Sequence, residues 1–434
     1  MAIFLDAGAP DFEQRFVALL SAKRESSDDV DQAVAAIIAD VRARGDAALA
    51  EYSLRFDRVD LARQGLRVSA GEIDAAVAES DPKAVEALRF AHERILAYNR
   101  RQAPDDVYFK DSLGVELGWR WRPIQSVGLY VPGGAASYPS SVLMNAAPAK
   151  VAGCARVAMV VPTPDGRVNP LVLAAARIAG VDEIYRVGGA QAIAALAYGT
   201  ESIAPVAKIV GPGNAYVAAA KRRVFGVVGI DMIAGPSEVV VLADSSADPR
   251  FVAADLLAQA EHDEAAQSIL VTDDAALAHA VSAEVERQLA RLPRERIAGA
   301  SWRDYGAIIL VARLDAAVPL IDRLAPEHLE IIARDADAIS REIHNAGAIF
   351  LGAHTPEAIG DYVGGSNHVL PTSRSARFSS GLGVHDFVKR TSILKCDANS
   401  LAALGPSAIT LGEAEGLAAH ARSVSIRLSP DVSE

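Results

Sequence analysis

Gln259 and His262 stand three positions apart in the segment LLAQAEHDE, residues 256–264. Side chains at this spacing share one face of a helix, so the pair could offer two ligands to a single metal ion. Histidine is a common zinc ligand. Glutamine is a rare one, and an acidic helix end with a histidine is usually only solvated surface. Taken alone, the motif therefore favours an ordinary structural role over metal binding.

A second candidate is the pair Glu327 and His328 in LAPEHLE, residues 324–330. Pro326 is suited to the first position of a helix, which would put the pair in its first turn. A carboxylate beside an imidazole at an exposed helix start could act as an acid–base pair. An acidic residue there could equally do no more than complement the helix dipole. The motif alone leaves these two interpretations balanced.

Two further segments carry polar groups that could reach a cleft. Asp361, a hard anionic ligand candidate, stands in the glycine-rich stretch AIGDYVGGSNHVLPT, residues 358–372. Such a polar loop gains little from burial, so its residues favour a binding role. Glu415 and His420 lie in a predicted C-terminal helix. A purely structural role remains open for each segment taken singly.

Three glycine-rich turns occur at YVPGG (130–134), VGGAQ (187–191) and GPGN (211–214). Glycine lets backbone N–H groups approach a phosphate closely. The dinucleotide fingerprint GxGxxG is absent after any predicted strand. Each turn alone is more simply a connecting loop, but all three should lie where the carboxyl ends of parallel strands form a ligand crevice.

The elements that must position these residues follow an α/β pattern from about residue 122. The continuous apolar run at 157–161 predicts a buried parallel strand. Further strands are predicted at 183–187, 238–242 and 268–272. Asn169-Pro170 and Asp248-Pro249 each predict the start of a helix between two such strands. Two βαβ units of similar layout indicate an internal duplication of a Rossmann-like unit, and a third α/β stretch covers 305–350.

The flanking regions read as helical. Segments 28–52 and 82–98 carry apolar residues at helical spacing, so residues 1 to about 105 are expected to be mainly helical. The last fifty or so residues, from about Gly381, also look helical. They are too few to form a core of their own, so they should wrap another domain or a second subunit.

Composition limits the classes of protein. A chain of 434 residues suggests two to four domains at ~150 residues each, and 51% hydrophobic residues exclude a disordered or fibrous chain. The net charge of −12 argues against nucleic-acid binding. Two cysteines, Cys154 and Cys396, indicate a reducing compartment. With neither a signal-peptide pattern nor a membrane-length apolar run, we expect a cytoplasmic protein with no membrane partner.

As a set, the motifs resemble those of a known family. Six segments of this sequence occur in the order found in histidinol dehydrogenases, and the resemblance extends from about Ser126 to Ser423. They are GPGNAYV, AGPSEVVVLAD, LLAQAEHD, LAPEHLE, GDYVGGSNHVLPT and EGLAAH. The length and organisation of the chain also suit that family.

The resemblance implies a role for each matching residue. Zinc, one ion per subunit, would be bound by Gln259, His262, Asp361 and His420, and these four with Ser237, His328 and Glu415 would contact the substrate. Glu327 and His328 match the catalytic pair, while Tyr130, Gln191 and Asn214 match positions that hold NAD. His420 and Glu415 would reach the site from the partner subunit. No ligand role is implied for the nearby His368.

The resemblance also implies the organisation. Two incomplete Rossmann-like domains would bind the cofactor weakly and without GxGxxG, in an intertwined homodimer. We expect a helical N-terminal region at 1–121, part of it packing on the second α/β domain, an NAD-binding domain at 122–236, a zinc-binding catalytic domain at 237–380, and a helical tail at 381–434 that reaches the partner.

The implied reaction takes L-histidinol to L-histidine through L-histidinal with two NAD. His328 would take the alcohol proton and Glu327 would activate the water that hydrates the aldehyde. Two alternatives compete with this prediction. A paralogue could oxidise another polar alcohol such as a sulfonated diol, but it should have lost Glu415. A zinc-binding structural protein with a vestigial site should have lost matching residues at random.

Overall fold

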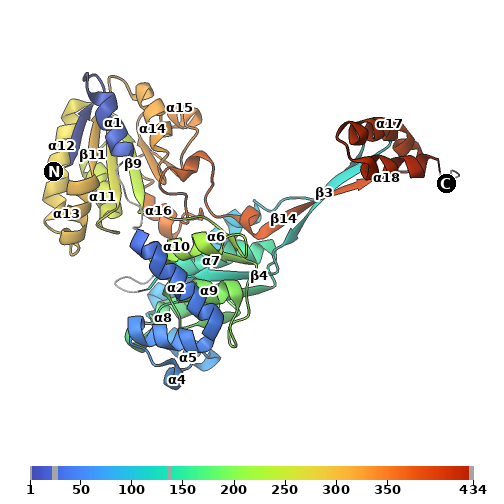
Figure 1. The fold of residues 1–434 in the computed structure, drawn as a ribbon. Coiled ribbons are helices and arrows are strands. Elements are labelled where there is room, and N and C mark those ends of the chain that lie inside the picture. Colours follow the sequence, from blue (N-terminus) through green and yellow to red (C-terminus); the bar gives the residue numbers. More distant parts are fainter. Residues whose placement is uncertain (1, 22–27, 134–137, 430–434) are drawn as a thin grey trace. The chain divides into compact units, whose positions relative to one another are not determined.

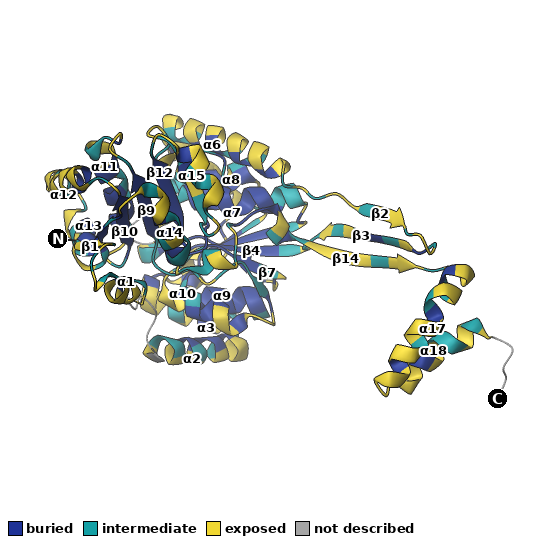
Figure 2. Ribbon diagram, turned by 90° about the horizontal axis from the view of Figure 1, so that it is seen from above, coloured by how far each residue is buried: buried dark blue, intermediate teal, exposed yellow. Residues whose placement is uncertain are grey.

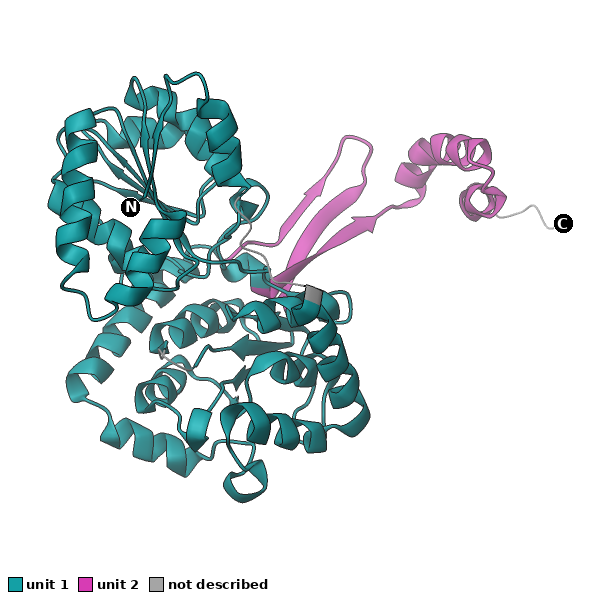
Figure 3. Ribbon diagram, turned by 60° about the vertical axis from the view of Figure 1, so that its left-hand side comes forward, with its two compact units in different colours: residues 1–102, 124–386 teal, residues 103–123, 387–434 magenta. Residues whose placement is uncertain are grey.

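The computed structural model describes residues 2–21, 28–133 and 138–429. The chain forms two compact units (Figure 3). The first joins Met1–Gln102 to Ile124–Asp386, and the second joins Ala103–Pro123 to Phe387–Glu434. Figure 1 labels many of the elements and colours them along the chain.

The first unit contains a five-stranded sheet whose neighbouring strands are all parallel. Its order is β6-β5-β4-β7-β8. The strands are β4 (Ser126–Tyr130), β5 (Arg156–Val160), β6 (Glu183–Tyr185), β7 (Lys208–Val210) and β8 (Gly229–Ile230). The three glycine-rich turns follow the carboxyl ends of β4, β6 and β7, as predicted, except that Gly134 lies outside the described residues.

Helices from two parts of the sequence pack around this sheet. The N-terminal ones are α2 (Asp28–Arg44), α3 (Asp46–Tyr52), α4 (Leu61–Gln64), α5 (Ala70–Glu79) and α6 (Pro82–Arg100). Those between the strands are α7 (Pro139–Ala152), α8 (Pro170–Ala179), α9 (Gly189–Tyr198) and α10 (Ala215–Val224). Residues of α2, α9 and α10 share one buried core with β4 and β5.

The predicted start of α8 is confirmed. The side chain of Asn169 caps the helix by accepting from Leu171 N, Pro170 takes the first position, and Gly180 ends the helix with a φ of 69°. That φ lies in the left-handed region, which glycine adopts without strain. Local sequence chemistry therefore decides both ends of this helix.

The second sheet has six parallel strands in the order β1-β11-β10-β9-β12-β13. Its strands are β1 (Ile3–Asp6), β9 (Glu238–Ala243), β10 (Gln267–Thr272), β11 (Ala307–Leu310), β12 (His328–Ile332) and β13 (Ala348–Leu351). β9, β10 and β12 are buried along their whole length, as the dark blue ribbons show (Figure 2). Continuous apolar runs of this kind are expected in a parallel sheet covered on both faces.

Successive residues of β9 point into two separate cores. Val239 and Val241 pack with α11 (Pro249–Ala260), α12 (Ala275–Leu289) and α13 (Glu295–Tyr305). Val240 and Leu242 pack on the other face with α1 (Phe12–Leu20) and α14 (Val318–Leu324). The remaining helices of this part are α15 (Ala336–Glu342) and α16 (Glu357–Tyr362).

The second unit combines a sheet with two helices. β3 (Glu116–Pro123) lies between β2 (Val107–Lys110) and β14 (Val388–Lys395), and both pairings are antiparallel. α17 (Ala398–Ala414) packs on α18 (Ala418–Leu428) at glycines, since a Cβ on Gly412 would press on Ala421 and one on Gly405 would overlap Leu428.

The prediction of mainly helical flanking regions is wrong in three places. β2 and most of β3 lie within the predicted helical region 1–121 and are strands. β1 is a strand that pairs with β11 at the edge of the six-stranded sheet. The tail begins with β14, which pairs with β3 over eight residues. In each case pairing with another strand decides the local structure, and periodicity within the segment does not reveal such a partner. Among the described residues, no helix is both long and apolar enough to cross a bilayer.

Candidate active site

The candidate catalytic residues gather where strands of the six-stranded sheet begin. His328 is the first residue of β12, and Ser237 directly precedes β9. Gln259 lies in the last turn of α11, and His262 lies in the connection from α11 to β10. This is the amino edge of the sheet, whereas ligands of open α/β sheets usually bind at the carboxyl edge.

The backbone of Glu238 holds the two predicted catalytic side chains. Its N–H donates to Glu327 Oε2 at 2.9 Å, and its carbonyl oxygen lies 3.1 Å from His328 Nδ1. Both side chains are at least 95% buried. One residue of β9 therefore fixes the carboxylate just before β12 and the imidazole of its first residue.

The prediction that this pair lies in the first turn of a helix is wrong. Helix α14 ends at Leu324, Ala325 adopts a left-handed φ of 46°, and β12 begins at His328. Pro326 lacks an N–H and restricts the residue before it, so it separates helix from strand here. Glu327 therefore does not lie at a helix start, and the interpretation that it complements a helix dipole is wrong.

The surroundings of His328 define its proton state. A ring nitrogen beside a carbonyl must carry the proton, so Nδ1 donates to Glu238 and Nε2 keeps a free lone pair. Nε2 is buried without a hydrogen-bond partner among the described residues and lies 3.8 Å from Asp361 Oδ1. Burial lowers the pKa of His328 to about 3. The imidazole is therefore neutral near pH 7, which is the form a general base requires.

Three of the predicted zinc ligands come together beside this histidine. Gln259 Nε2 lies 3.0 Å from His262 Nδ1, while Gln259 Oε1 is buried and has no hydrogen-bond partner in the described part of the chain. Burial lowers the pKa of His262, and the charge of Asp361 opposes that shift. Burial also raises the pKa of Asp361 to about 6, which His262 in turn opposes. His262 and Asp361 therefore act on each other electrostatically.

Two residues that sequence reasoning did not assign also belong to this cluster. Glu357 is buried, and its Oε1 lies 3.7 Å from His328 Nδ1. With His328 and Asp361 it forms a group whose ligand atoms lie within 4.8 Å of one another, close enough to hold a metal ion. Glu357 precedes Asp361 by one helical turn, and this i, i+4 spacing was the available signal. His368 Nδ1 donates to Asp361 O at 2.9 Å and so supports the backbone of that residue.

A further acidic group ties together the elements that carry the site. Glu330 on β12 accepts from the N–H of Glu357, the first residue of α16, at 2.6 Å. Its side chain also interacts with the carboxyl group of Asp255 on α11. Burial raises the pKa of Glu330 to about 9, and the nearby Asp255 adds to that shift. Glu330 therefore keeps its proton near pH 7 and can donate it to Asp255.

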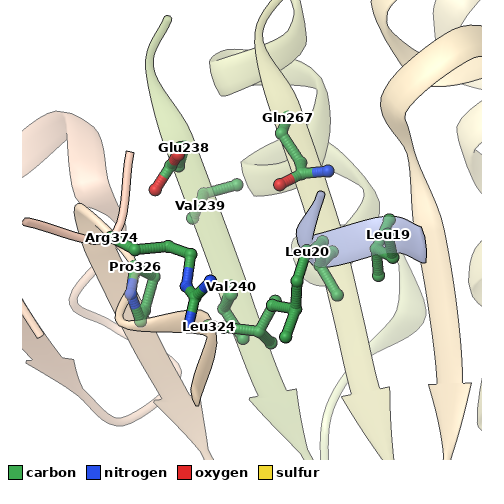
Figure 4. A pocket seen from close by; sticks show the side chains of 10 residues that line it. Leu19, Leu20, Glu238, Val239, Val240, Gln267, Leu324, Pro326 and Arg374 are labelled. Atoms are coloured by element: carbon green, nitrogen blue, oxygen red, sulfur yellow. The ribbon is translucent and has the colours of Figure 1, made fainter. Parts of the chain in front are cut away.

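A small pocket opens beside the site at the same amino edge (Figure 4). Its polar lining groups are Glu238, Gln267 and Arg374, and none of the predicted site residues lines it. The side chain of Glu238 accepts from Ser373 N at 3.1 Å. Glu238 thus anchors the loop after residue 370 with its side chain and the catalytic pair with its backbone.

The predicted NAD-contacting residues lie at the carboxyl edge of the five-stranded sheet. Tyr130 ends β4, and its hydroxyl accepts from Gly189 N at 3.1 Å, where α9 begins. Burial raises the pKa of Tyr130 to about 12. Gln191 is buried in the first turn of α9. Asn214 caps α10 by accepting from the N–H groups of Tyr216 and Val217.

Glu415 and His420 lie in the second unit. Glu415 is the residue after α17 and His420 stands in the first turn of α18, so the predicted single C-terminal helix is in fact two helices. Both residues are exposed within that unit. They therefore belong to a different unit from the other predicted site residues.

Comparisons with known proteins give the family. Residues 20–428 match the family model described as histidinol dehydrogenase. The chain is 67% identical to a histidinol dehydrogenase of Bradyrhizobium diazoefficiens over 429 residues, which is 99% of this chain and 100% of that one. Over 431 residues it is 66% identical to one from Agrobacterium fabrum, again with 99% and 100% coverage.

A solved structure agrees with these sequence relatives. The crystal structure of histidinol dehydrogenase from Elizabethkingia anophelis matches with a TM-score of 0.94 and 36% sequence identity. The match covers 100% of this chain and 99% of that chain. The mixed α/β fold with parallel sheets is thus shared along the full length, and the chain belongs to the histidinol dehydrogenase family.

Proposed function

We propose that this chain oxidises L-histidinol to L-histidine through L-histidinal, with two NAD as hydride acceptors. The family is that of NAD-dependent oxidoreductases acting on an alcohol. The observation that carries the assignment to this site is a pair of buried, unpartnered atoms, Gln259 Oε1 and His328 Nε2, among the described residues. The amide oxygen of Gln259 can bind a metal ion or accept a hydrogen bond, and the ring nitrogen of His328 can accept a proton.

The residues present fit a zinc ion. An amide oxygen, an imidazole and a carboxylate are supplied by Gln259, His262 and Asp361, and the first of these has no other partner in the described chain. Imidazole and carboxylate are both usual zinc ligands. Zinc, when bound, would hold and orient the substrate by its polar groups. His420 is proposed as a fourth ligand, supported by its place in the EGLAAH motif.

His328 is proposed as the base for the alcohol. Its Nε2 lone pair is free, and its Nδ1 proton is committed to Glu238 O. As hydride leaves the carbinol carbon for NAD, the hydroxyl proton passes to Nε2. The resulting imidazolium would lie within 4 Å of carboxyl oxygens of Glu327, Glu357 and Asp361. Burial raises the pKa of Glu357 well above its ordinary value, so the charge that favours the imidazolium is chiefly that of Asp361.

Glu327 is proposed to serve the second half of the reaction. The aldehyde must take up water before a second hydride can leave, and a carboxylate can remove the proton from that water. Glu327 Oε2 accepts from Glu238 N, which holds the group in place while the carboxylate acts. Ser237, next to that N–H in the sequence, is proposed to contact the substrate.

The cofactor is proposed to lie at the carboxyl edge of the five-stranded sheet, held by Tyr130, Gln191 and Asn214. The two sheets share one strand order. When the strands β4 to β8 and the strands β9 to β13 are each numbered 1 to 5 along the chain, both sets lie side by side in the order 3-2-1-4-5. This supports an internal duplication, with residues 122–236 serving NAD and 237–380 serving zinc and catalysis. We further propose a cytoplasmic homodimer in which the tail from 381 brings Glu415 and His420 to the partner's site.

The competing substrate, a sulfonated diol, is not favoured. Glu415, suited to an amino or imidazole group, is retained in this sequence, whereas a sulfonate would be repelled by it. Zinc-loaded protein should therefore form NADH with L-histidinol and none with a sulfonated propanediol at equal concentration. NADH formation with the diol alone would reject the proposed substrate.

A further inference from the structure

The buried ion pair Lys221–Asp231 is hydrogen-bonded to the backbone of Gly211, the first residue of the GPGN turn. Asp231 Oδ2 accepts from Gly211 N at 2.8 Å, and Lys221 Nζ donates to Gly211 O at 2.9 Å. Lys221 and Asp231 also pair with each other, and their side chains are only 2% and 1% exposed. Both peptide groups that flank the Gly211 Cα are thus held from outside the turn.

Gly211 is a residue that needs such support. Its φ of 109° lies in a region open only to glycine, and a Cβ there would overlap the carbonyl oxygen of Tyr130. Glycine also has the largest backbone freedom to lose. An unsupported Gly211 would therefore sample several conformations, and the direction of the next three residues would vary with it.

Those next residues lead to the proposed cofactor site. Pro212 and Gly213 connect Gly211 to Asn214, whose side chain caps α10. Gly211 also lies directly against the backbone of Tyr130, the last residue of β4. The turn is therefore in contact with another residue of the proposed cofactor site. Lys221 sits two turns along α10, and Asp231 directly follows β8. The pair therefore fastens helix, strand and turn to one another at a single peptide position.

We infer that Lys221 and Asp231 are positioning residues for NAD, which hold the GPGN turn in its binding conformation before the cofactor arrives. The inference rests on the proposed cofactor site at Tyr130, Gln191 and Asn214. A preformed site binds more tightly because the ligand does not bear the cost of ordering it. Removing the pair should therefore weaken NAD binding without altering the chemistry of the histidinol site.

The alternative is that the pair serves stability alone. A buried pair stripped of one partner leaves an unpaired charge and is strongly destabilising, whereas removing both charges together is often tolerated. The variant Lys221→Met/Asp231→Asn is therefore the main test, with Asp231→Asn alone as the second. Glu183→Gln is the matched control, because Glu183 pairs with Arg156 at 2.8 Å at the amino end of the same sheet.

The readouts are the dissociation constant for NADH, measured by fluorescence without turnover, and the KM values for NAD and histidinol. For the double variant we expect NADH binding and the KM for NAD to weaken on the order of tenfold. The kcat at saturating NAD and the KM for histidinol should stay within about twofold of wild type. Glu183→Gln should leave all four constants unchanged.

A folded double variant with wild-type affinity for NADH overturns the inference, and so does loss of fold in both variants. A wild-type protein that binds no NADH overturns it as well, together with the cofactor site. If wild type binds NADH yet does not oxidise histidinol, the proposed reaction fails, while a tenfold loss of NADH binding in the variant still supports the positioning role.

Discussion

His328 donates its Nδ1 proton to the carbonyl oxygen of Glu238 at 3.1 Å, and this bond selects the tautomer that leaves Nε2 free. The N–H of Glu238 meanwhile donates to Glu327 at 2.9 Å. Acid–base chemistry in this site is therefore set by the backbone of a neighbouring strand. Such a scaffold is rigid, which is what a positioned base requires.

Glu327 and His328 should divide the two half-reactions. Glu327→Gln keeps an oxygen for Glu238 N but loses the base, so histidinol should still reach the aldehyde level while conversion to histidine stalls. His328→Asn should slow both hydride steps by ~10²–10⁴, the usual effect of losing a positioned base. Stopped-flow NADH formation from histidinol and from histidinal measures each step. Equal damage to both steps in Glu327→Gln would refute the division.

His262→Ala and Asp361→Ala should each lose tightly bound zinc and nearly all activity, with the fold retained. Each removes a charged oxygen or an imidazole from the proposed ion. Metal analysis of the purified variants and circular dichroism check both parts. His344→Ala is the control, since that histidine pairs with Asp322 on the surface. A full zinc equivalent retained in both variants would show that the ligands lie elsewhere.

The Asp255–Glu330 pair predicts how stability depends on pH. Burial raises the folded-state pKa of Glu330 from 4.5 to about 9, so between these values the folded chain keeps a proton that the unfolded chain releases. The free energy of unfolding must then fall as pH rises through this window, by at most ~1.4 kcal/mol per pH unit for one proton. This contribution is fully present only at the acidic end of the window.

Glu330→Gln removes that proton yet can still donate to Asp255 and accept from Glu357 N. The variant should thus gain stability relative to wild type as pH rises from 5 to 9. Urea unfolding of the zinc-free proteins measures the difference at each pH. The exposed Glu86 on α6 gives the control Glu86→Gln, for which the difference should stay flat. A flat difference for Glu330→Gln as well would contradict the assignment of its proton.

The active site should be shared between two subunits. The second unit exposes apolar side chains on and beside its helices, Leu411, Leu417 and Ile426, close in sequence to Glu415 and His420. Exchange of such an element is a known route to a dimer. An inactive Glu327→Gln/His328→Asn chain refolded with an inactive His420→Ala chain should regain activity well above either parent. Heterodimers that form yet stay inactive would mean that His420 acts within its own chain.

Sequence patterns located most of this fold because the signals were local. Asn169-Pro170 and Gly180 mark both ends of α8, and the valine run of β9 marks a strand buried on both faces. The start of β12 was misjudged because Pro326 suits a helix start and a helix end alike. Its strand character comes from pairing with β9 and β13, which are distant in sequence.

The candidate site shows the same limit. Motifs pointed to Gln259, His262, Glu327, His328 and Asp361, and the structure brings these five together. They did not point to Glu238 or Glu330, whose roles depend on a backbone contact across strands and on a buried proton. The role of Lys221 and Asp231 could not be predicted either, because no sequence pattern indicates that both side chains bind the backbone of Gly211.

The stoichiometry of the complete reaction tests the proposed function most directly. Zinc-loaded enzyme is given limiting L-histidinol and excess NAD, NADH is measured by absorbance at the end point, and the product is identified by mass spectrometry. Two NADH are expected for each histidinol, with histidine as the product. One NADH with accumulated aldehyde, or no NADH at all, would contradict the proposed function.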